Sequence, residues 1–188
     1  RSLHPKQCIM QSPYLFTSKR LGFRNWTFDD LEFLTKMNSD KEVMKFFPQL
    51  LSEEESEAFI HRMQRQFNEY NYCYYATEEV TTQNLIGFVG LAYQDYKAKF
   101  NPATDIGWRL ATSAWGKGYA TEGAQRCLEH GFQELKLPRI VATCPIINKP
   151  SENVMKKIGM ERKGVYKHPK LSGYPTLEKC VWYEARNQ

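Results

Sequence analysis

Apolar residues recur along this chain with the periods of helices and of strands. Ser52 to Glu55 has the spacing of a capping box, in which a serine and a glutamate exchange hydrogen bonds at a helix start. The apolar residues that follow keep a helical period: Phe59, Ile60, Met63, Phe67 and Tyr70. We therefore predict a helix that begins after Ser52 and buries this face.

A second helical pattern follows the paired glycines Gly116 and Gly118. Six residues recur at i, i+3, i+4, i+7, i+8 and i+11 and predict one buried helix face: Ala124, Cys127, Leu128, Gly131, Phe132 and Leu135. A third, shorter helix is predicted after Asn148, a typical N-cap residue. Pro150 lies in its first turn and Gly159 at its end, the positions that these residues favour.

Five segments between these helices have the composition of strands: residues 72–76, 85–92, 104–110, 139–144 and 180–183. The polar residues 81–84 separate the first two and predict a turn. Strands and helices in this order predict an α/β fold, in which a mixed sheet carries helices on both faces. No repeat or low-complexity linker divides the chain.

Length and composition fit one domain over residues 1–188. A chain of 188 residues, 41% of them hydrophobic, can bury most of its unfolded surface around a single core. No apolar run approaches the ~18 residues that a membrane span needs, so we expect no membrane association and no signal peptide. Arg1 and Ser2 stand without a methionine, and we interpret residues 1–10 as a fusion remnant or a flexible tail.

The cysteines and histidines carry no sign of a metal site or a disulfide scaffold. The five cysteines are scattered and form no Cys-x-x-Cys pair: Cys8, Cys73, Cys127, Cys144 and Cys180. This spacing favours the reducing cytoplasm, with the cysteines as small core residues. The four histidines are isolated from one another and from the cysteines, so we expect no metal.

The net charge of +5 is modest for this length. A basic surface can steer acidic ligands or nucleic acid towards a protein. The sequence contains no block of five or more Lys and Arg residues, and no basic stripe interleaved with aromatic residues. We therefore expect no direct binding of nucleic acid.

The glycine pair lies between the strand at 104–110 and the second helix. Two glycines let the backbone turn sharply and expose successive N–H groups. At a helix N-terminus such N–H groups form a cradle for phosphate or pyrophosphate. Gly118 stands where a Walker loop has Ser or Thr after its lysine, and Thr121 stands where a dinucleotide fingerprint has a third Gly or Ala. We predict a different phosphate-bearing cofactor, the alternative being a plain surface turn.

A longer signature extends on both sides of this turn. It consists of Asp105-Ile106-Gly107-Trp108-Arg109-Leu110, Trp115-Gly116-Lys117-Gly118-Tyr119-Ala120-Thr121-Glu122, Asn148-Lys149-Pro150-Ser151 and Met155-Lys156-Lys157-Ile158-Gly159. The combination resembles the acetyl-CoA site of the GNAT N-acetyltransferases and, more narrowly, of their RimJ/RimL-type branch. The resemblance covers about residues 14–185. It implies a single acetyltransferase domain with a mostly antiparallel, twisted sheet and a V-shaped splay between the strands at 104–110 and 139–144.

The resemblance implies acetyl-CoA as the acyl donor. Backbone N–H groups from Gly116 to Ala120 would hold the pyrophosphate, and backbone near Leu110 would pair with the pantetheine arm. The implied cofactor-binding residues are Leu110, Trp115, Gly116, Lys117, Gly118, Tyr119, Ala120 and Asn148. For Lys117 the backbone is meant, because its side chain can point to solvent.

Two residues are candidates for proton transfer. Asp105 begins the cofactor strand, where the family commonly carries an acidic base, although an aspartate there can also simply start the strand. An exposed carboxyl titrates near ~4, so a base at Asp105 requires burial or a water relay. Met155 stands where many members carry a tyrosine acid, and the resemblance offers the Ser151 hydroxyl instead. Ser151 can equally serve hydrogen bonding at its helix start.

The implied reaction is direct attack of a primary amine on acetyl-CoA in a ternary complex. The acceptor is a protein N-terminal α-amine or a small-molecule amine. An α-amine titrates near ~8 and a lysine near ~10.4, a difference of roughly 3 kcal/mol that favours the α-amine. Phe46, Phe47, Tyr72 and Tyr74 are candidates for the acceptor side or for the core.

The sequence leaves some alternatives open. A non-catalytic acyl-CoA-binding regulatory module would keep the glycine turn without turnover, and the absence of the family tyrosine at Met155 motivates this reading. Transfer of a longer acyl group depends on a pocket depth that the sequence does not define. An acyl-cysteine route through Cys144 is disfavoured, because we expect this cysteine to be a core residue. The sequence also leaves open whether the protein forms a homodimer.

Overall fold

The computed structural model describes residues 11–188, so residues 1–10, with Cys8 and the predicted remnant or tail, lie outside the described part. Within it, one sheet contains eight strands: β1 (Phe16–Thr17), β2 (Leu21–Arg24), β3 (Tyr74–Glu79), β4 (Leu85–Gln94), β5 (Ala103–Leu110), β6 (Arg139–Pro145), β7 (Glu161–Lys167) and β8 (Lys179–Arg186). The helices are α1 (Leu31–Asn38), α2 (Glu53–Tyr70), α3 (Tyr119–Gln133) and α4 (Lys149–Lys157). Short 3-10 turns occur at Phe28–Asp30, Thr112–Ala114 and Pro169–Leu171.

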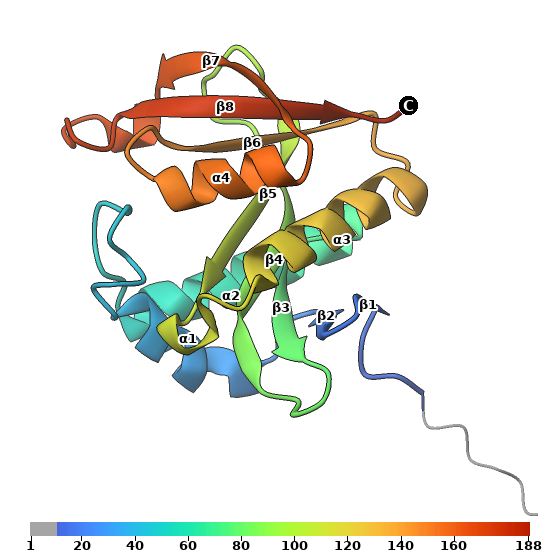
Figure 1. Ribbon diagram of the computed structural model, residues 1–188. Helices are drawn as coiled ribbons and strands as arrows, with labels where there is room; N and C mark the ends of the chain where they lie inside the picture. The colour runs from blue at the N-terminus through green and yellow to red at the C-terminus, as the bar shows by residue number, and fades with distance from the viewer. Residues whose placement is uncertain (1–10) are drawn as a thin grey trace, which may run out of the picture.

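The strands lie in the order β1-β2-β3-β4-β5-β6-β8-β7, and every neighbouring pair is antiparallel except β5 and β6. These two parallel strands share a single paired position, Asp105 with Val141. Beyond that position they diverge, so the upper part of the sheet in Figure 1 (β6, β7 and β8) separates from the lower part. The predicted V-shaped splay is therefore present.

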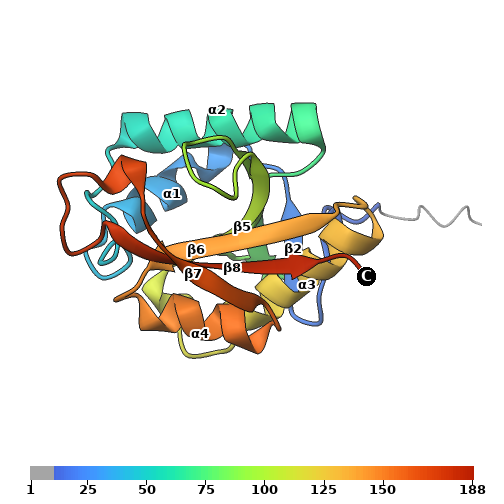
Figure 2. The ribbon, with the colours of Figure 1, turned by 90° about the horizontal axis from the view of Figure 1, so that it is seen from above.

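Helices cover both faces of the sheet, as predicted. Figure 2 shows α1 and α2 on one side of the strands, and α3 and α4 on the other. Gly131 of α3 lies so close to the sheet that a Cβ there would come within 2.7 Å of Ile140 Cδ1. Only a residue without a side chain allows this close approach of helix to strand.

The predicted helix starts are confirmed. Ser52 accepts a hydrogen bond from the Glu55 N–H, the Glu55 carboxylate accepts one from the Ser52 N–H, and α2 follows. Asn148 caps α4 through its side-chain oxygen, which accepts the Ser151 N–H at 3.2 Å. Gly159 follows α4 with φ of +82°, a conformation that favours glycine.

Several elements were not predicted from the hydrophobic pattern. The strand β7 is largely exposed because it lies at the edge of the sheet, so its sequence lacks the apolar residues of an interior strand. The short strands β1 and β2 and the helix α1 were also missed. The strand predicted to begin at residue 72 begins at Tyr74, as β3. Tyr72 and Cys73 are buried, but they precede the ladder that β3 forms with β4.

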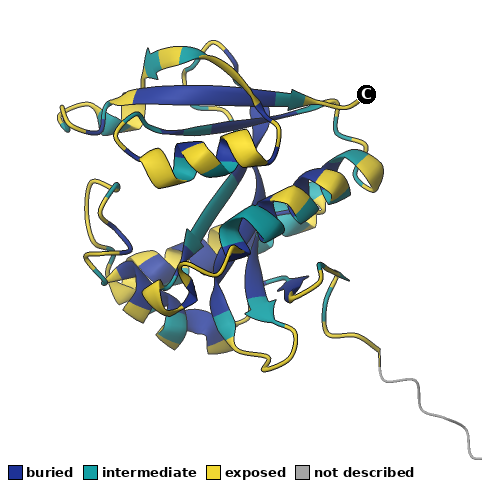
Figure 3. Cartoon of the chain, viewed as in Figure 1, coloured by how far each residue is buried: buried dark blue, intermediate teal, exposed yellow. Residues whose placement is uncertain are grey.

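The core lies between the sheet and its helices. Figure 3 shows the interior strands as mostly buried and the helices as buried on one face only. Cys73, Cys127, Cys144 and Cys180 are buried free thiols, which confirms that these four are core residues. Within residues 11–188, no helix is both long and apolar enough to cross a membrane.

Candidate functional site

Two cavities meet where β5 and β6 diverge. The first, of about 560 Å³, extends along the end of β5 to the glycine turn and the start of α3, and we call it the turn groove. The second, of about 480 Å³, lies over the middle of β5 between α2 and α4, and we call it the Asp105 cavity. The two cavities share a wall of six residues: Phe46, Phe47, Trp108, Arg109, Asn148 and Ser151. The two cavities are therefore adjacent.

The turn groove is built mainly from backbone. Gly116 and Gly118 have φ of +72° and +77°, a conformation that other residues adopt at a cost of about 1–2 kcal/mol. The N–H groups of residues 116–121 donate to no acceptor within the described part of the chain, since the first turn of a helix has no intrahelical partners for them. A Cβ at Gly116 would meet nothing within 4 Å, so the space in front of this turn is open.

Side chains next to the turn hold it in place. The Tyr119 hydroxyl donates to Glu79 at 2.5 Å, and the Arg20 guanidinium lies 4.4 Å from the centre of the Tyr119 ring. Trp115 donates its indole N–H to the Leu110 carbonyl at 2.9 Å. The Leu110 carbonyl is therefore already hydrogen-bonded. Before Leu110, the edge of β5 that faces the splay pairs with β6 only at Asp105, so the rest of that edge has no strand partner. The exposed Lys117 side chain does not line the groove.

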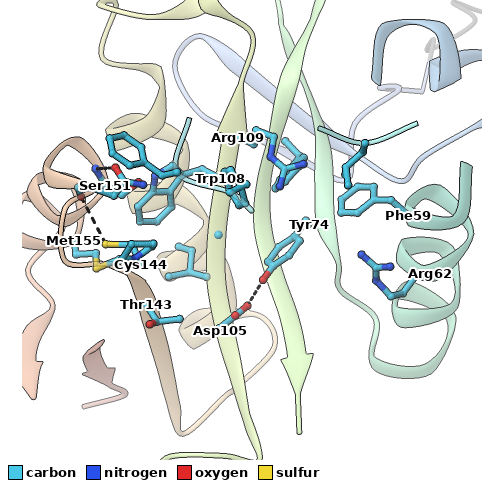
Figure 4. A pocket seen from close by; sticks show the side chains of 18 of the residues that line it. Phe59, Arg62, Tyr74, Asp105, Trp108, Arg109, Thr143, Cys144, Ser151 and Met155 are labelled. Atoms are coloured by element: carbon cyan, nitrogen blue, oxygen red, sulfur yellow. Dashed lines mark hydrogen bonds between the residues drawn. The ribbon is translucent and has the colours of Figure 1, made fainter. Parts of the chain in front are cut away.

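Asp105 is buried, with only 8% of its surface exposed, at the one position that joins β5 to β6. The Tyr74 hydroxyl donates to its carboxylate at 2.5 Å (Figure 4), and Gln94 donates to the Tyr74 oxygen at 3.2 Å. Burial raises the pKa of Asp105 to about 7, while the bonds from Tyr74 and Gln94 and the charge of Lys170 act in the opposite direction. A carboxyl with a pKa near neutrality can accept and release a proton at physiological pH.

Tyr74 reaches Asp105 because a glycine leaves room for its ring. Asp105, Gly107 and Arg109 alternate along β5 and point to one face of the sheet. A Cβ at Gly107 would come within 3.0–3.3 Å of the Tyr74 ring and hydroxyl. The ring therefore lies over Gly107 from β3, two strands away, and stacks on Phe88 at 5.4 Å between centroids.

The opposite wall is formed by α4 and the end of β6. Figure 4 shows Thr143, Cys144, Ser151 and Met155 on this side, facing Asp105, Trp108 and Arg109 of β5. The half-buried Ser151 hydroxyl has no hydrogen-bond partner within residues 11–188, whereas the backbone N–H of the same residue donates to the Asn148 side-chain oxygen. Burial raises the pKa of the Cys144 thiol to about 12. Its sulfur lies 3.7 Å from the Asn148 carbonyl, to which it donates.

Asp105, Ser151 and Asn148 all line the Asp105 cavity, and Ser151 and Asn148 also line the turn groove. Of the aromatic candidates, Phe46, Phe47 and Tyr74 line the Asp105 cavity. Tyr72 does not line it, because its hydroxyl is bonded to the Thr104 hydroxyl at 2.6 Å inside the core. Tyr72 is therefore a core residue, whereas the acceptor role of the other three stays a prediction.

Sequence reasoning gave no role to two charged residues of the Asp105 cavity, Arg62 and Arg109. Arg62 projects into it from α2, and Arg109 from β5 (Figure 4). Arg109 occurs inside the sequence signature, but its charge was given no purpose, and Arg62 belongs to a polar helix face with no motif. Only its helical position, three residues after the buried Phe59, hinted that it lies near the sheet.

Within the described residues, no group of three or more His, Cys, Asp or Glu side chains is arranged to hold a metal ion. Lys149 and Lys156 of α4 lie 3.7 and 3.8 Å from the same oxygen of Glu152, so both face this carboxylate on their own helix. Beside the buried Asp105 carboxyl, the Asp105 cavity is lined by hydroxyl groups of Tyr74, Thr143 and Ser151 and by the guanidinium groups of Arg62 and Arg109.

Comparisons with known proteins agree with this architecture. The uncharacterized N-acetyltransferase YnaD of Bacillus subtilis (strain 168) is 38% identical over 152 residues, which cover 80% of this chain and 85% of that protein. A GNAT-family acetyltransferase from Bacillus anthracis has a crystal structure with a TM-score of 0.75 and 30% identity, covering 91% of this chain and 97% of the other.

A second solved structure shares the fold at lower identity. The spermidine N-acetyltransferase of Vibrio cholerae, solved in complex with CoA and spermine, has a TM-score of 0.69 and 19% identity over 89% of this chain and 96% of that one. Residues 20–161 match the sequence profile of the acetyltransferase (GNAT) domain family. That span includes the glycine turn, Asp105, Asn148 and Ser151. The chain therefore belongs to the GNAT acetyltransferase family.

Proposed function

We propose that this protein is an acetyl-CoA-dependent N-acetyltransferase of the RimJ/RimL type, which acetylates a primary amine by direct attack within a ternary complex. One observation carries the proposal: a backbone cradle for phosphates and a buried carboxyl lie in two cavities with a common wall. The RimJ/RimL assignment is supported by the motif from Asp105 to Glu122 and by the hydroxyl at Ser151. A cytoplasmic location stays a prediction, in keeping with four free thiols.

The turn groove fits the donor. Free N–H groups of residues 116–121 suit a pyrophosphate at a helix N-terminus. The unpaired edge of β5 before Leu110 suits the amide groups of a pantetheine arm, which can pair as a strand does. Acetyl-CoA, when bound, supplies an acetyl group activated as a thioester. Trp115 and Asn148 border the groove on either side, consistent with contacts to that donor.

Asp105 is the base in this proposal. With a pKa near 7 it accepts a proton from the acceptor's ammonium group and leaves the neutral amine that attacks. Tyr74 holds the carboxylate in place through its hydroxyl. Ser151 donates a proton from Oγ to the departing thiolate, since this hydroxyl lies on the wall that both cavities share. Asp105 and Ser151 thus place the base and the acid on opposite walls of the Asp105 cavity.

Direct attack is favoured over an acyl-cysteine route. Cys144 is the cysteine that lines the Asp105 cavity, and its pKa of about 12 keeps it as a thiol at neutral pH. The thiolate is the nucleophilic form of cysteine. A protonated, buried Cys144 is therefore a part of the cavity wall rather than a nucleophile.

The test measures thiol release from acetyl-CoA with a panel of amines and N-terminal peptides, beside calorimetric titration of acetyl-CoA alone. We expect micromolar binding and thiol release that depends on an acceptor. Binding without release from any amine would replace the proposal by an acyl-CoA-binding regulatory module. Absence of binding would contradict both functions.

A further inference from the structure

Two guanidinium groups face the Asp105 cavity without a carboxylate partner. Within residues 11–188, Arg62 and Arg109 take part in no ion pair, whereas several other arginines do. Arg109 donates one hydrogen bond, to the neutral side-chain oxygen of Asn38 at 2.8 Å, and its buried Nε has no partner there. Arg109 is half-buried, and a charged group that is partly removed from water normally requires an opposite charge. Arg62 is exposed, and it lines the cavity from the solvent side of α2.

The surroundings of Arg109 are apolar rather than acidic. Its guanidinium lies 4.2 Å from the centre of the Phe47 ring and 5.2 Å from that of Phe88. Burial, together with the nearby charge of Arg62, lowers the pKa of Arg109 to about 10, while Tyr74 acts in the opposite direction. Both arginines remain protonated at neutral pH, so the cavity holds two positive charges. No ion pair with a carboxylate within residues 11–188 offsets their mutual repulsion.

The carboxyls in this cavity are engaged elsewhere. Glu55 accepts the Ser52 N–H at the start of α2, at 2.7 Å. Asp105 accepts the Tyr74 hydroxyl and is partly protonated at neutral pH because its pKa is about 7. Neither forms an ion pair with Arg62 or Arg109. The missing negative charge is therefore one that a ligand can supply.

The cavity separates this positive end from the base. Asp105 and Arg109 lie on the same face of β5, four residues apart, or roughly 13 Å between Cα atoms at the usual strand rise. The Tyr74 ring covers Gly107 between them and forms a flat floor. An extended di- or tripeptide spans roughly 7–10 Å between its amine and its carboxylate, which is of the same order as this gap.

We propose that the acceptor is a small amine that also carries an anionic group, a carboxylate or a phosphate, which Arg62 and Arg109 bind while its amino group lies at Asp105. This proposal rests on the proposed function and names its substrate class. The anion is not one of the donor phosphates, because the cradle for these lies at the glycine turn. Arg109 borders both cavities, but Arg62 lines the Asp105 cavity and not the turn groove. A polyamine is disfavoured, since its second cation would meet two guanidiniums.

The experiment compares acceptors that differ only in the anion. Alanyl-glycyl-glycine is paired with its C-terminal amide, and aminobutyl phosphate with aminobutanol, so that the two pairs distinguish carboxylate from phosphate. We expect kcat/KM to be at least tenfold higher for the anionic member of one pair, mainly through KM. In Arg62→Gln and Arg109→Gln this ratio should fall towards one.

Arg65→Gln is the matched control, because Arg65 lies one turn further along α2 and is exposed like Arg62 but does not line the cavity. It should keep the full ratio. Equal kcat/KM for both members of each pair would overturn the inference and leave the acetyltransferase intact.

A binding measurement keeps the inference testable if turnover fails. Calorimetry compares the N-acetylated tripeptide acid with its amide, and N-acetylaminobutyl phosphate with N-acetylaminobutanol, on the protein saturated with CoA. Tighter binding of an anionic member, lost in Arg62→Gln but kept in Arg65→Gln, would support the anion site. Equal binding within both pairs would reject it. Absence of thiol release from every amine would instead count against the proposed function.

Discussion

The two cavities that meet at the splay are built in different ways. The turn groove uses the backbone of consecutive residues, and its key feature is the conformation of Gly116 and Gly118. The Asp105 cavity gathers side chains from α2, β3, β4, β5, β6 and α4, and its key feature is their charge and burial. Backbone chemistry is the same for any substrate of the family, whereas side-chain chemistry can change between members. The difference suggests that donor binding and acceptor choice can be altered independently.

The substitution Asp105→Asn should have the largest effect, and it should affect the functions of the two cavities most differently. Asparagine keeps an oxygen for the Tyr74 hydroxyl but cannot accept the proton, so we expect kcat to fall by about 10²–10⁴-fold. Affinity for acetyl-CoA should stay within about twofold, because Asp105 does not line the turn groove. Steady-state kinetics and calorimetry measure both. An unchanged kcat would remove Asp105 from the mechanism.

The same variant should change the pH dependence of stability. The pKa of Asp105 is raised from 3.8 to about 7 in the folded protein, so the folded state holds this proton more tightly than the unfolded state. This group's stabilising contribution is present below pH ~4 and is lost as pH rises towards 7. Between pH 5 and 8 the loss of this contribution should lower the free energy of unfolding by about 2–3 kcal/mol. Urea unfolding of Asp105→Asn should lack this decrease, and an identical decrease in both proteins would contradict the burial argument.

A valine at Gly116 tests the turn groove. The side chain would enter the open space in front of the turn and strain a backbone at φ of +72°, so we expect affinity for acetyl-CoA to fall about tenfold or more. The pH profile of kcat should not move. Gly173→Val is the control, since Gly173 has φ of +90°, no neighbour within 4 Å of its Cβ position, and lies outside both cavities. Equal affinity losses in both variants would point to general strain instead.

The smallest effect is expected from Tyr74→Phe. The Tyr74 hydroxyl lowers the pKa of Asp105, so its removal should raise that pKa above 7. The rising limb of kcat/KM should then shift to higher pH by about half a unit to one unit, and activity at pH 7 should fall severalfold. A uniform loss at every pH would show that Tyr74 acts on packing alone. Asp105→Asn and Tyr74→Phe combined should show no further pH shift.

Much of the fold was visible in the sequence because it depends on local signals. The capping box at Ser52, the N-cap at Asn148 and the spacing of Ala124 and Leu128 each predict structure from neighbouring residues, and each is confirmed. The edge strand β7 was missed, because an exposed strand does not need alternating apolar residues. Its position is set by pairing with β8, far along the chain.

The candidate site likewise has features that depend on local sequence and features that depend on the tertiary structure. The sequence by itself determined the glycine turn, the helix start behind it and the family, since a backbone cradle requires particular residues in an unbroken run. It named Asp105 and Ser151 but not their surroundings. Only the tertiary structure placed Tyr74 over Gly107 and buried Asp105, and it alone brought Arg62 of α2 to the cavity that Arg109 lines. The reason is physical: pKa and charge depend on the atoms within a few ångströms, and here those atoms belong to residues far apart in the chain.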